Sequence, residues 1–193
     1  MDVQSSPSIR WPQRFDPGRA PIFVSNELTA TAPPEAVWAW LVSAPLWPSF
    51  YSNSANVVLD GGAGQLADGT RFRWKTFGVN LRTEVKEFDP IQRIAWHAKG
   101  LGVDAYHAWL LTPTADGACH ILTQETQYGW LARLGKLLMP NRMHRQHQRW
   151  LEGLAATANS QPPAEPRQRH TSRRRYRVGG RNRRRWRSAL EFQ

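Results

Sequence analysis

Three polar side chains fall on strand faces that are otherwise apolar, and these residues are the best placed for chemistry. Thr123 and Glu125 alternate with Ile121 in one predicted strand, and His107 lies among apolar residues in the strand before it. Burying such groups costs free energy unless they find partners. A carboxyl group in an apolar cavity has a raised pKa, which suits general acid–base chemistry. We therefore interpret Glu125 and His107 as candidate catalytic residues that orient or protonate a ligand oxygen.

A purely structural interpretation of the same pair stays open. Glu125 and His107 would then form a hydrogen bond that only stabilises the fold, or a strand bulge would turn one of them to solvent. The sequence has no G-x-S-x-G nucleophile motif and no H-E-x-x-H zinc motif. Cys119 is the only cysteine, and we expect it to be a small buried or edge residue without a catalytic part.

Aromatic residues form the second candidate set, and their densest run is PLWPSFY at 45–51, after a predicted helix. Aromatic side chains supply a large apolar area, and strand alternation puts several of them on the same faces as His107 and Glu125. We predict that they wall an internal cavity for an apolar or aromatic small molecule, with ordinary core packing as the alternative. Together with Thr123, the predicted ligand-binding residues are Trp47, Phe50, Tyr51, Phe72, Trp74, Trp96, Trp109 and Tyr128.

The sequence predicts no metal site. His144 and His147 are three residues apart on a predicted helix, but Arg142, Arg145 and Arg149 flank them and would repel a cation. No cysteine or acidic cluster lies near them in the sequence, so we interpret this side of the helix as a solvated basic face.

The sequence predicts no cofactor either. The glycine-rich loop at 60–69 lacks the phosphate-binding and dinucleotide-binding patterns, and we interpret it as a flexible mouth or turn. His97 and His120 fall on the strand faces opposite the proposed cavity, where we expect them to be exposed.

Hydrophobic periodicity predicts the elements that position these residues. Residues 21–31 alternate as a strand, and the next segment is a helix whose first turn holds Pro33 and Pro34. About six further alternating segments follow, which predicts consecutive antiparallel strands. The last element is a long helix over 131–157 that should kink or break at Pro140. An antiparallel sheet with helices at the two ends of the sequence is an α+β arrangement.

A set of motifs occurs in order within residues 21–157. They are TAPPEAVWAWL at 31–41, WPSFY at 47–51, GTRFRW at 69–74, EFDPIQRIAWHAKG at 87–100, YHAWLLTP at 106–113, TQETQYG at 123–129 and HRQHQRWLEGL at 144–154. In these motifs the chain resembles the START-like, helix-grip superfamily, also called SRPBCC, and within it the polyketide cyclase/dehydrase-like branch. The resemblance implies a curved antiparallel sheet wrapped around a long C-terminal helix, with an internal cavity between them and a polar or acidic residue near Glu125. The superfamily includes lipid carriers, hormone receptors and cyclases, so the resemblance implies a fold more than a reaction.

Charge divides the chain into a nearly neutral part and a basic tail. Residues 1–159 hold 15 Lys and Arg against 13 Asp and Glu, whereas residues 160–193 hold 11 Arg against 2 Glu. A tail of this composition cannot bury a core, so we predict that it is disordered. The predicted units are an extended N-terminal arm over 1–20, a START-like ligand-binding domain over 21–158 and an Arg-rich disordered tail over 159–193.

Three functions remain open from the sequence. The first is binding of a hydrophobic small molecule, such as a polyketide, a lipid or an aromatic metabolite. The second is a cyclase/dehydrase-type enzyme that uses Glu125 and His107. The third is binding of nucleic acid, or of an anionic surface, through the Arg-rich segment 167–187, which is otherwise an extension without a role. The N-terminal residues lack a signal-peptide pattern and no segment has the ~20 apolar residues of a spanning helix, so we expect a cytoplasmic protein.

Overall fold

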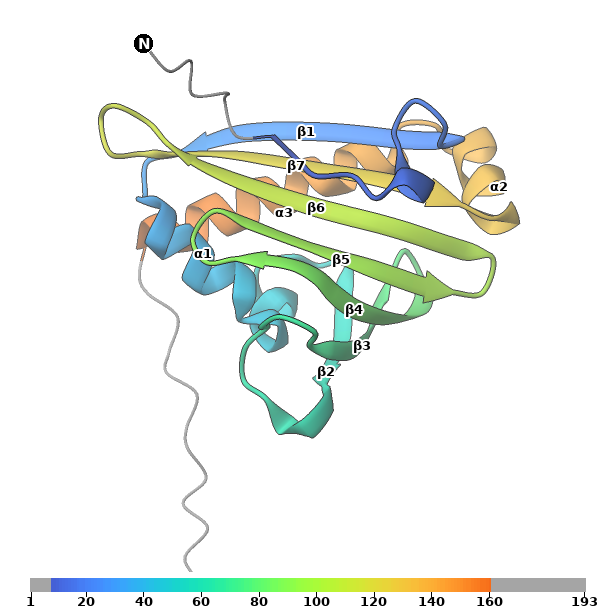
Figure 1. The fold of residues 1–193 in the computed structure, drawn as a ribbon, viewed down its shortest axis with the longest axis horizontal. Helices are drawn as coiled ribbons and strands as arrows, with labels where there is room; N and C mark the ends of the chain where they lie inside the picture. Colours follow the sequence, from blue (N-terminus) through green and yellow to red (C-terminus); the bar gives the residue numbers. More distant parts are fainter. Residues whose placement is uncertain (1–7, 161–193) are drawn as a thin grey trace, which may run out of the picture.

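The structure is a computed structural model that describes residues 8–160 (Figure 1). A single antiparallel sheet has seven strands in the order β1-β7-β6-β5-β4-β3-β2. The Arg-rich tail was predicted over 159–193, and its residues from 161 onward lie outside the described residues. The strands are β1 Ile22–Ala30, β2 Ser54–Leu59, β3 Arg71–Thr76, β4 Val79–Asp89, β5 Arg93–Gly100, β6 Val103–Pro113 and β7 Cys119–Tyr128. The α-helices are α1 Pro34–Val42, α2 Trp130–Leu138 and α3 Arg142–Ser160, and the short 3-10 helices are η1 Gln13–Phe15, η2 Ala44–Ser49 and η3 Asp60–Gly62.

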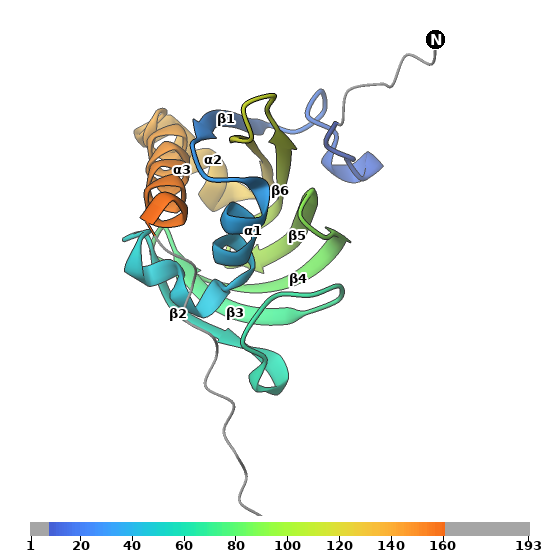
Figure 2. The same ribbon diagram turned by 90° about the vertical axis from the view of Figure 1, so that its left-hand side faces the viewer.

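The sheet is curved, and α1 and α3 lie on its concave side (Figure 2). Irregular pairing between Ala55 and Val58 in β2, and between Val85 and Glu87 in β4, marks bulges of the kind that bend and twist a sheet. The helix α3 runs along β1 and also contacts α1. The predicted α+β helix-grip arrangement is therefore confirmed.

The predicted terminal helix is broken at the expected proline. The helix α2 ends at Leu138 and α3 begins at Arg142, so Pro140 lies in the short connection between them. Proline has no backbone N–H group and its ring clashes with the preceding turn, which ends a helix. The break lets α2 leave the line of α3 and cover the ends of β1, β6 and β7.

The hairpin between β3 and β4 shows how local sequence sets the register. Phe77 and Gly78 form its two-residue turn, and their φ values are 51° and 82°. Positive φ at both central positions matches the twist of the flanking strands. The turn therefore pairs Thr76 with Val79 and places Trp74 opposite Leu81 on the concave face.

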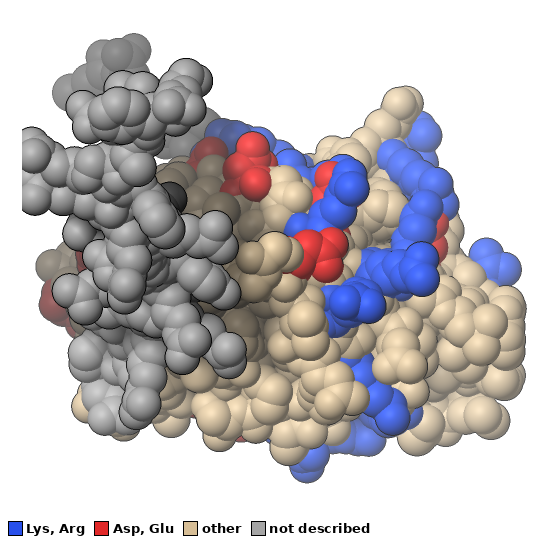
Figure 3. All heavy atoms as spheres, turned by 90° about the horizontal axis from the view of Figure 1, so that it is seen from below, with Lys and Arg blue, Asp and Glu red and all other residues tan. Residues whose placement is uncertain are grey.

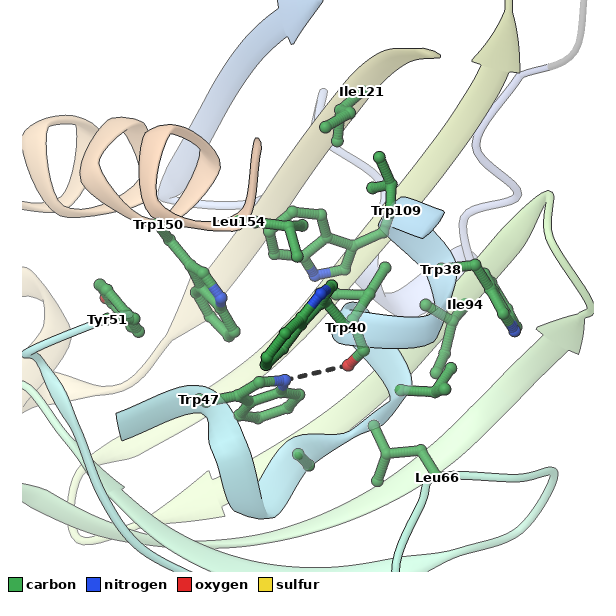
Figure 4. Close-up of a cluster of buried hydrophobic side chains, with 14 of the residues drawn as sticks. Trp38, Trp40, Trp47, Tyr51, Leu66, Ile94, Trp109, Ile121, Trp150 and Leu154 are labelled. Atoms are coloured by element: carbon green, nitrogen blue, oxygen red, sulfur yellow. Dashed lines mark hydrogen bonds between the residues drawn. The ribbon is translucent and has the colours of Figure 1, made fainter. Parts of the chain in front are cut away.

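Tryptophans dominate the core between the sheet and the helices (Figure 4). Trp47 in η2 is fully buried, and its ring lies 5.0–5.4 Å from the rings of Trp74, Trp96 and Trp150. Its indole N–H donates to the carbonyl oxygen of Leu41 at 2.9 Å, a bond drawn in Figure 4. The aromatic run after α1 therefore anchors the helix exit to the centre of the core.

The N-terminal arm is docked on the convex face of the sheet. Its residues 8–20 run outside β6 and β7 in Figure 1, and Phe15 is buried there. The Phe15 ring stacks on Tyr106 with centroids 5.4 Å apart, and Thr126 donates a hydrogen bond to the Phe15 carbonyl oxygen. The described part of the arm thus adds a small second core outside the sheet.

The folded unit continues past the boundary expected at residue 158. The side-chain oxygen of Asn159 accepts a hydrogen bond from the backbone N–H of Ala32 at 2.7 Å, which ties the end of α3 to the start of α1. Between residues 8 and 160, none of the helices has the length and apolar character needed to cross a membrane.

Candidate functional site

A buried polar cluster lies where β6, β7 and α3 meet. His107 on β6 and Glu125 on β7 are directly paired across the two strands, and His147 reaches them from α3. Glu125 Oε2 lies 3.2 Å from His107 Nδ1 and 3.1 Å from His147 Nε2. All three residues are buried, with exposed fractions of 2%, 7% and 1% for His107, Glu125 and His147. The structure thus brings His107 and Glu125 together and adds His147 as a third member of the cluster.

Hydrogen bonds fix the orientation of the cluster. His107 Nε2 lies 2.7 Å from the Thr123 hydroxyl, which is also 3.3 Å from the carbonyl oxygen of Ala108. If His107 is neutral, the shorter contact favours a Thr123 hydroxyl that donates to Nε2 and an Nδ1–H that donates to Glu125. Gln127 donates to the other carboxylate oxygen of Glu125. Thr123 and Gln127 therefore orient the cluster from the same strand as Glu125.

The electrostatics favour a neutral imidazole beside an ionised carboxylate. Burial lowers the pKa of His107 to about 3, and the Glu125 carboxylate only partly offsets this effect. Burial alone would raise the pKa of Glu125, but His107 and the hydrogen bonds from His147 and Gln127 outweigh it, so the pKa is lowered. The expectation of a raised Glu125 pKa is thus wrong, because the carboxylate is surrounded by donors rather than by apolar groups alone.

A pocket of about 320 Å³ opens from this cluster between the sheet, α2 and α3. The cluster residues His107, Glu125 and His147 all line it. Its walls are mostly apolar, and at one end they include exposed residues of α2. The apolar walls include Tyr51, Trp74, Val79, Leu81, Trp96, Ala98, Val103, Ala105, Leu131, Leu134, Leu138, Met139, Met143 and Trp150.

The predicted aromatic wall divides into two layers. Tyr51, Trp74 and Trp96 line the pocket itself. The other predicted members of the concave side, Trp47, Phe50, Phe72, Trp109 and Thr123, do not line it. Trp47, Phe72 and Trp109 are fully buried behind the lining, Phe50 packs against the core from η2, and Thr123 holds His107. The pocket is therefore displaced from the aromatic centre toward α2.

Tyr128 was expected in the cavity wall and lies on the opposite face of the sheet. Its hydroxyl donates to the carbonyl oxygen of Arg14, and its ring meets Phe15 edge-on at 6.0 Å. Side chains alternate along a strand, so a position three residues after Glu125 must point away from it. Tyr128 therefore belongs to the contact with the N-terminal arm.

The expectation of a solvated face for His147 is wrong. His144 is exposed, but His147 is buried against Glu125. The signal was present in the sequence, because His147 precedes Trp150 and Leu154 at the helical spacings of three and seven residues and so shares their buried stripe. The partner carboxylate comes from β7, and its proximity depends on how α3 crosses the sheet.

The helix α2 supplies a wall that the sequence did not identify. Leu131, Leu134, Leu138 and Met139 line the pocket, and the last three are also exposed to solvent. Amphipathic spacing was visible in this segment, but nothing local indicated that Pro140 would turn it across the pocket mouth. The pocket therefore reaches the surface beside α2.

The other histidines and the cysteine lie apart from this pocket. His97 is half-buried next to Asp104 at 2.5 Å under the N-terminal arm, so its expected exposure is only partial. His120 is 3.6 Å from Glu27 at a more open position. Cys119 is fully buried, and burial raises the pKa of its thiol to about 11, which agrees with a packing role.

Known structures share this fold. A hypothetical protein of Helicobacter pylori, jhp0584, is 35% identical with a TM-score of 0.75, over 81% of this chain and 99% of its own. Norcoclaurine synthase from Thalictrum flavum is 14% identical with a TM-score of 0.56, over 72% of this chain and 94% of its own. The di-domain ARO/CYC StfQ from the steffimycin biosynthetic pathway is 15% identical with a TM-score of 0.58, over 72% of this chain and 50% of its own. No match is found among curated protein sequences.

The curved sheet and the terminal helix form the START-like helix-grip fold, which these neighbours share. The sequence pattern of a family described as polyketide cyclase/dehydrase and lipid transport matches residues 22–159, which is most of the chain. The chain belongs to that family.

Proposed function

We propose that this protein binds an apolar small molecule in the pocket between the sheet, α2 and α3. The observation that carries the proposal is the combination of mostly apolar walls with one buried polar cluster, His107, Glu125 and His147, at the inner end. Ligand sites commonly combine a large apolar lining with a few placed polar groups that fix orientation. A volume of about 320 Å³ is at the lower end of the range for such sites.

The polar groups at the pocket favour a ligand that carries hydrogen-bond acceptors. Trp96 and Trp150 line the pocket, and within residues 8–160 their indole N–H groups have no hydrogen-bond partner although they are buried. A buried donor without a partner costs about 1–3 kcal/mol, which a ligand acceptor would recover. Together with the cluster, these donors favour an oxygenated polyketide, lipid or aromatic metabolite over a plain hydrocarbon chain. The family description, which names polyketide cyclases and lipid transport, supports the same ligand class.

An enzyme of the cyclase/dehydrase kind is the second candidate. It is favoured by the chain of contacts from Thr123 through His107 to Glu125, which holds a neutral imidazole and an ionised carboxylate at the pocket. In such an enzyme Glu125 would accept a proton from the substrate and His107 would hold the carboxylate in place. The solved ARO/CYC di-domain shares the fold of this chain and does not transfer a reaction to it.

Native mass spectrometry of the purified full chain tests the binding proposal first. We expect a mass adduct that leaves on denaturation and whose composition contains oxygen. Protein freed of ligand should then take up an apolar fluorescent probe. A chain that carries no adduct and takes up no probe would refute the proposal.

The matched variants Glu125→Gln and Glu152→Gln locate the site. Glu152 is exposed on α3, so its variant makes the same chemical change away from the pocket. We expect Glu125→Gln to weaken probe or ligand binding, while Glu152→Gln binds as the wild type does. If turnover of an identified ligand falls by ~10²-fold or more in Glu125→Gln with binding retained, the enzyme candidate replaces the binding one. Equal behaviour of both variants would exclude Glu125 from the site.

A further inference from the structure

We propose that His107, Glu125 and His147 form a site for a divalent metal ion, with Zn²⁺ the ion that their chemistry fits best. The three residues come from β6, β7 and α3, and their potential ligand atoms all lie within 4.8 Å of one another. Two imidazoles and one carboxylate are a frequent ligand set of catalytic zinc. The proposal is independent of what organic molecule occupies the pocket.

The spacing of the ligand atoms suits a metal centre. Glu125 Oε2 lies 3.2 Å from His107 Nδ1 and 3.1 Å from His147 Nε2. Around tetrahedral zinc, with bonds of about 2.0–2.1 Å, neighbouring ligand atoms are about 3.3–3.4 Å apart. The imidazole rings are nearly parallel, at 7°, with centroids 4.8 Å apart. A metal ion lies in the plane of each imidazole that binds it, so one of these two stacked rings must turn for both to bind the same ion.

Neighbouring groups support His107 and Glu125 in the way metal sites require, whereas Nδ1 of His147 has no hydrogen-bond partner within residues 8–160. A metal-bound histidine usually donates its other ring N–H to an oxygen atom. With Nδ1 on the metal, His107 Nε2–H would donate to Thr123 Oγ1 at 2.7 Å, and the Thr123 hydroxyl would turn to the Ala108 carbonyl oxygen at 3.3 Å. Gln127 already donates to the second oxygen of Glu125.

The charge around the cluster does not oppose a cation. Arg145 and Arg149, which flank His147 in the sequence, are exposed on α3. Arg142 is half-buried and lines the pocket, with its guanidinium 5.4 Å from the Phe77 ring centroid. The carboxylate of Glu125 is the charged group that contacts both imidazoles, so the charge at the proposed site itself is negative.

The pocket leaves a coordination position open. All three ligands line it, so the remaining position faces a cavity that a water molecule or a ligand oxygen can enter. Structural zinc sites are closed by four protein ligands, whereas sites with three protein ligands bind water or substrate in the fourth position. A metal here would therefore hold an oxygen atom of the pocket ligand.

Cobalt binding to the full chain, after treatment with a chelator and without added organic ligand, tests this site. We expect one Co²⁺ per chain with the intense visible absorption of a four- or five-coordinate site, and displacement of Co²⁺ by Zn²⁺. Variants His147→Gln and Glu125→Gln should weaken Zn²⁺ binding at least ~100-fold by calorimetry. Thr123→Val should weaken it ~10-fold to 100-fold through the lost support of His107.

Histidines outside the pocket provide the matched controls. His144→Gln makes the same change as His147→Gln one turn earlier on α3, and His120→Gln removes a histidine outside the pocket. Both controls should bind Zn²⁺ as the wild type does, and near-UV circular dichroism of each apo variant should match that of the apo wild type. The proposal fails if Co²⁺ gives no such absorption, or if the controls lose as much affinity as His147→Gln. It also fails if folded Glu125→Gln binds Zn²⁺ normally.

Discussion

At the scale of single residues, the pocket combines polar groups that are held in their uncharged form with others that stay charged. Tyr51 is 2% exposed, lines the pocket and stacks on Trp150 with ring centroids 4.5 Å apart. Burial raises the pKa of Tyr51 to about 12, although Asn53 and Thr76 at its hydroxyl oppose this rise. The folded state therefore keeps Tyr51 protonated at pH values where an unfolded chain loses the proton.

This difference predicts a loss of stability at alkaline pH. The unfolded tyrosine has a pKa near 10, so between about pH 10 and 12 the unfolded state binds fewer protons than the folded state. The free energy of unfolding should fall there by up to ~1.4 kcal/mol per pH unit from this residue. Urea unfolding at pH 9 to 11.5 measures the slope, and Tyr51→Phe should reduce it. An unchanged slope in a folded variant would mean that Tyr51 titrates normally.

At the scale of elements, α3 is packed closely on the segment that follows η2. A Cβ atom at Gly153 would lie 2.2 Å from the carbonyl oxygen of Phe50, so only glycine fits between the helix and this segment. A Cβ atom at Gly135 in α2 would meet nothing within 4 Å. The two helical glycines thus differ in the space around them.

Alanine at these two positions should therefore have opposite effects. Helix propensity alone favours alanine over glycine by about 1 kcal/mol. Gly135→Ala should raise the free energy of unfolding by roughly that amount. Gly153→Ala should lower it by ~2 kcal/mol or more, because α3 or the Phe50 segment must move. Thermal and urea unfolding measure both, and a stabilised Gly153→Ala would show that this contact is loose.

The helix α2 also forms the exposed wall of the pocket. Leu137 and Leu138 are adjacent and similarly exposed, at 78% and 67%, but only Leu138 lines the pocket. Leu138→Gln should weaken uptake of an apolar fluorescent probe several-fold, because it places an amide at the mouth. Leu137→Gln should leave uptake unchanged. If both variants bind the probe equally, ligands do not pass or touch this side of α2.

At the scale of the whole molecule, positive charge lies on the outside of the sheet as well as in the tail sequence. Arg71, Arg73, Lys75, Arg82 and Lys86 are exposed on β3 and β4. Figure 3 shows Lys and Arg side chains gathered on one face of the molecule, with few acidic groups among them. The face of β3 and β4 is therefore a second basic surface, besides the Arg-rich segment, to test for binding of a polyanion.

Removal of residues 161–193 separates these two sources. We expect the melting temperature to stay within a few degrees of that of the full chain, because the deleted segment has few apolar residues that could pack. If the Arg-rich segment binds nucleic acid, the truncated chain should lose salt-sensitive binding in a mobility-shift assay. Binding that survives truncation would point to basic residues of the folded part, such as those of β3 and β4. Unfolding of the truncated chain would contradict the predicted domain boundary.

Much of the fold could be predicted because its signals are local. Alternation along 92–100 and 103–113 predicted β5 and β6, which the structure has at Arg93–Gly100 and Val103–Pro113. Pro140 predicted the break between α2 and α3 because a proline acts on its own backbone. Strand alternation likewise put His107 and Glu125 on one face, although the same rule applied to Tyr128 would have excluded it from the cavity.

Only the tertiary structure decided how the site is completed. His147 joins Glu125 because α3 runs along β1, the neighbour of β7, at one particular height and rotation, and this depends on packing between elements far apart in the sequence. The position of the pocket depends in the same way on where α2 lies after Pro140. The sequence by itself determined the strands, the helix break and a polar pair on an apolar face. The third member of that cluster and its pocket arise from long-range contacts, which no local pattern encodes.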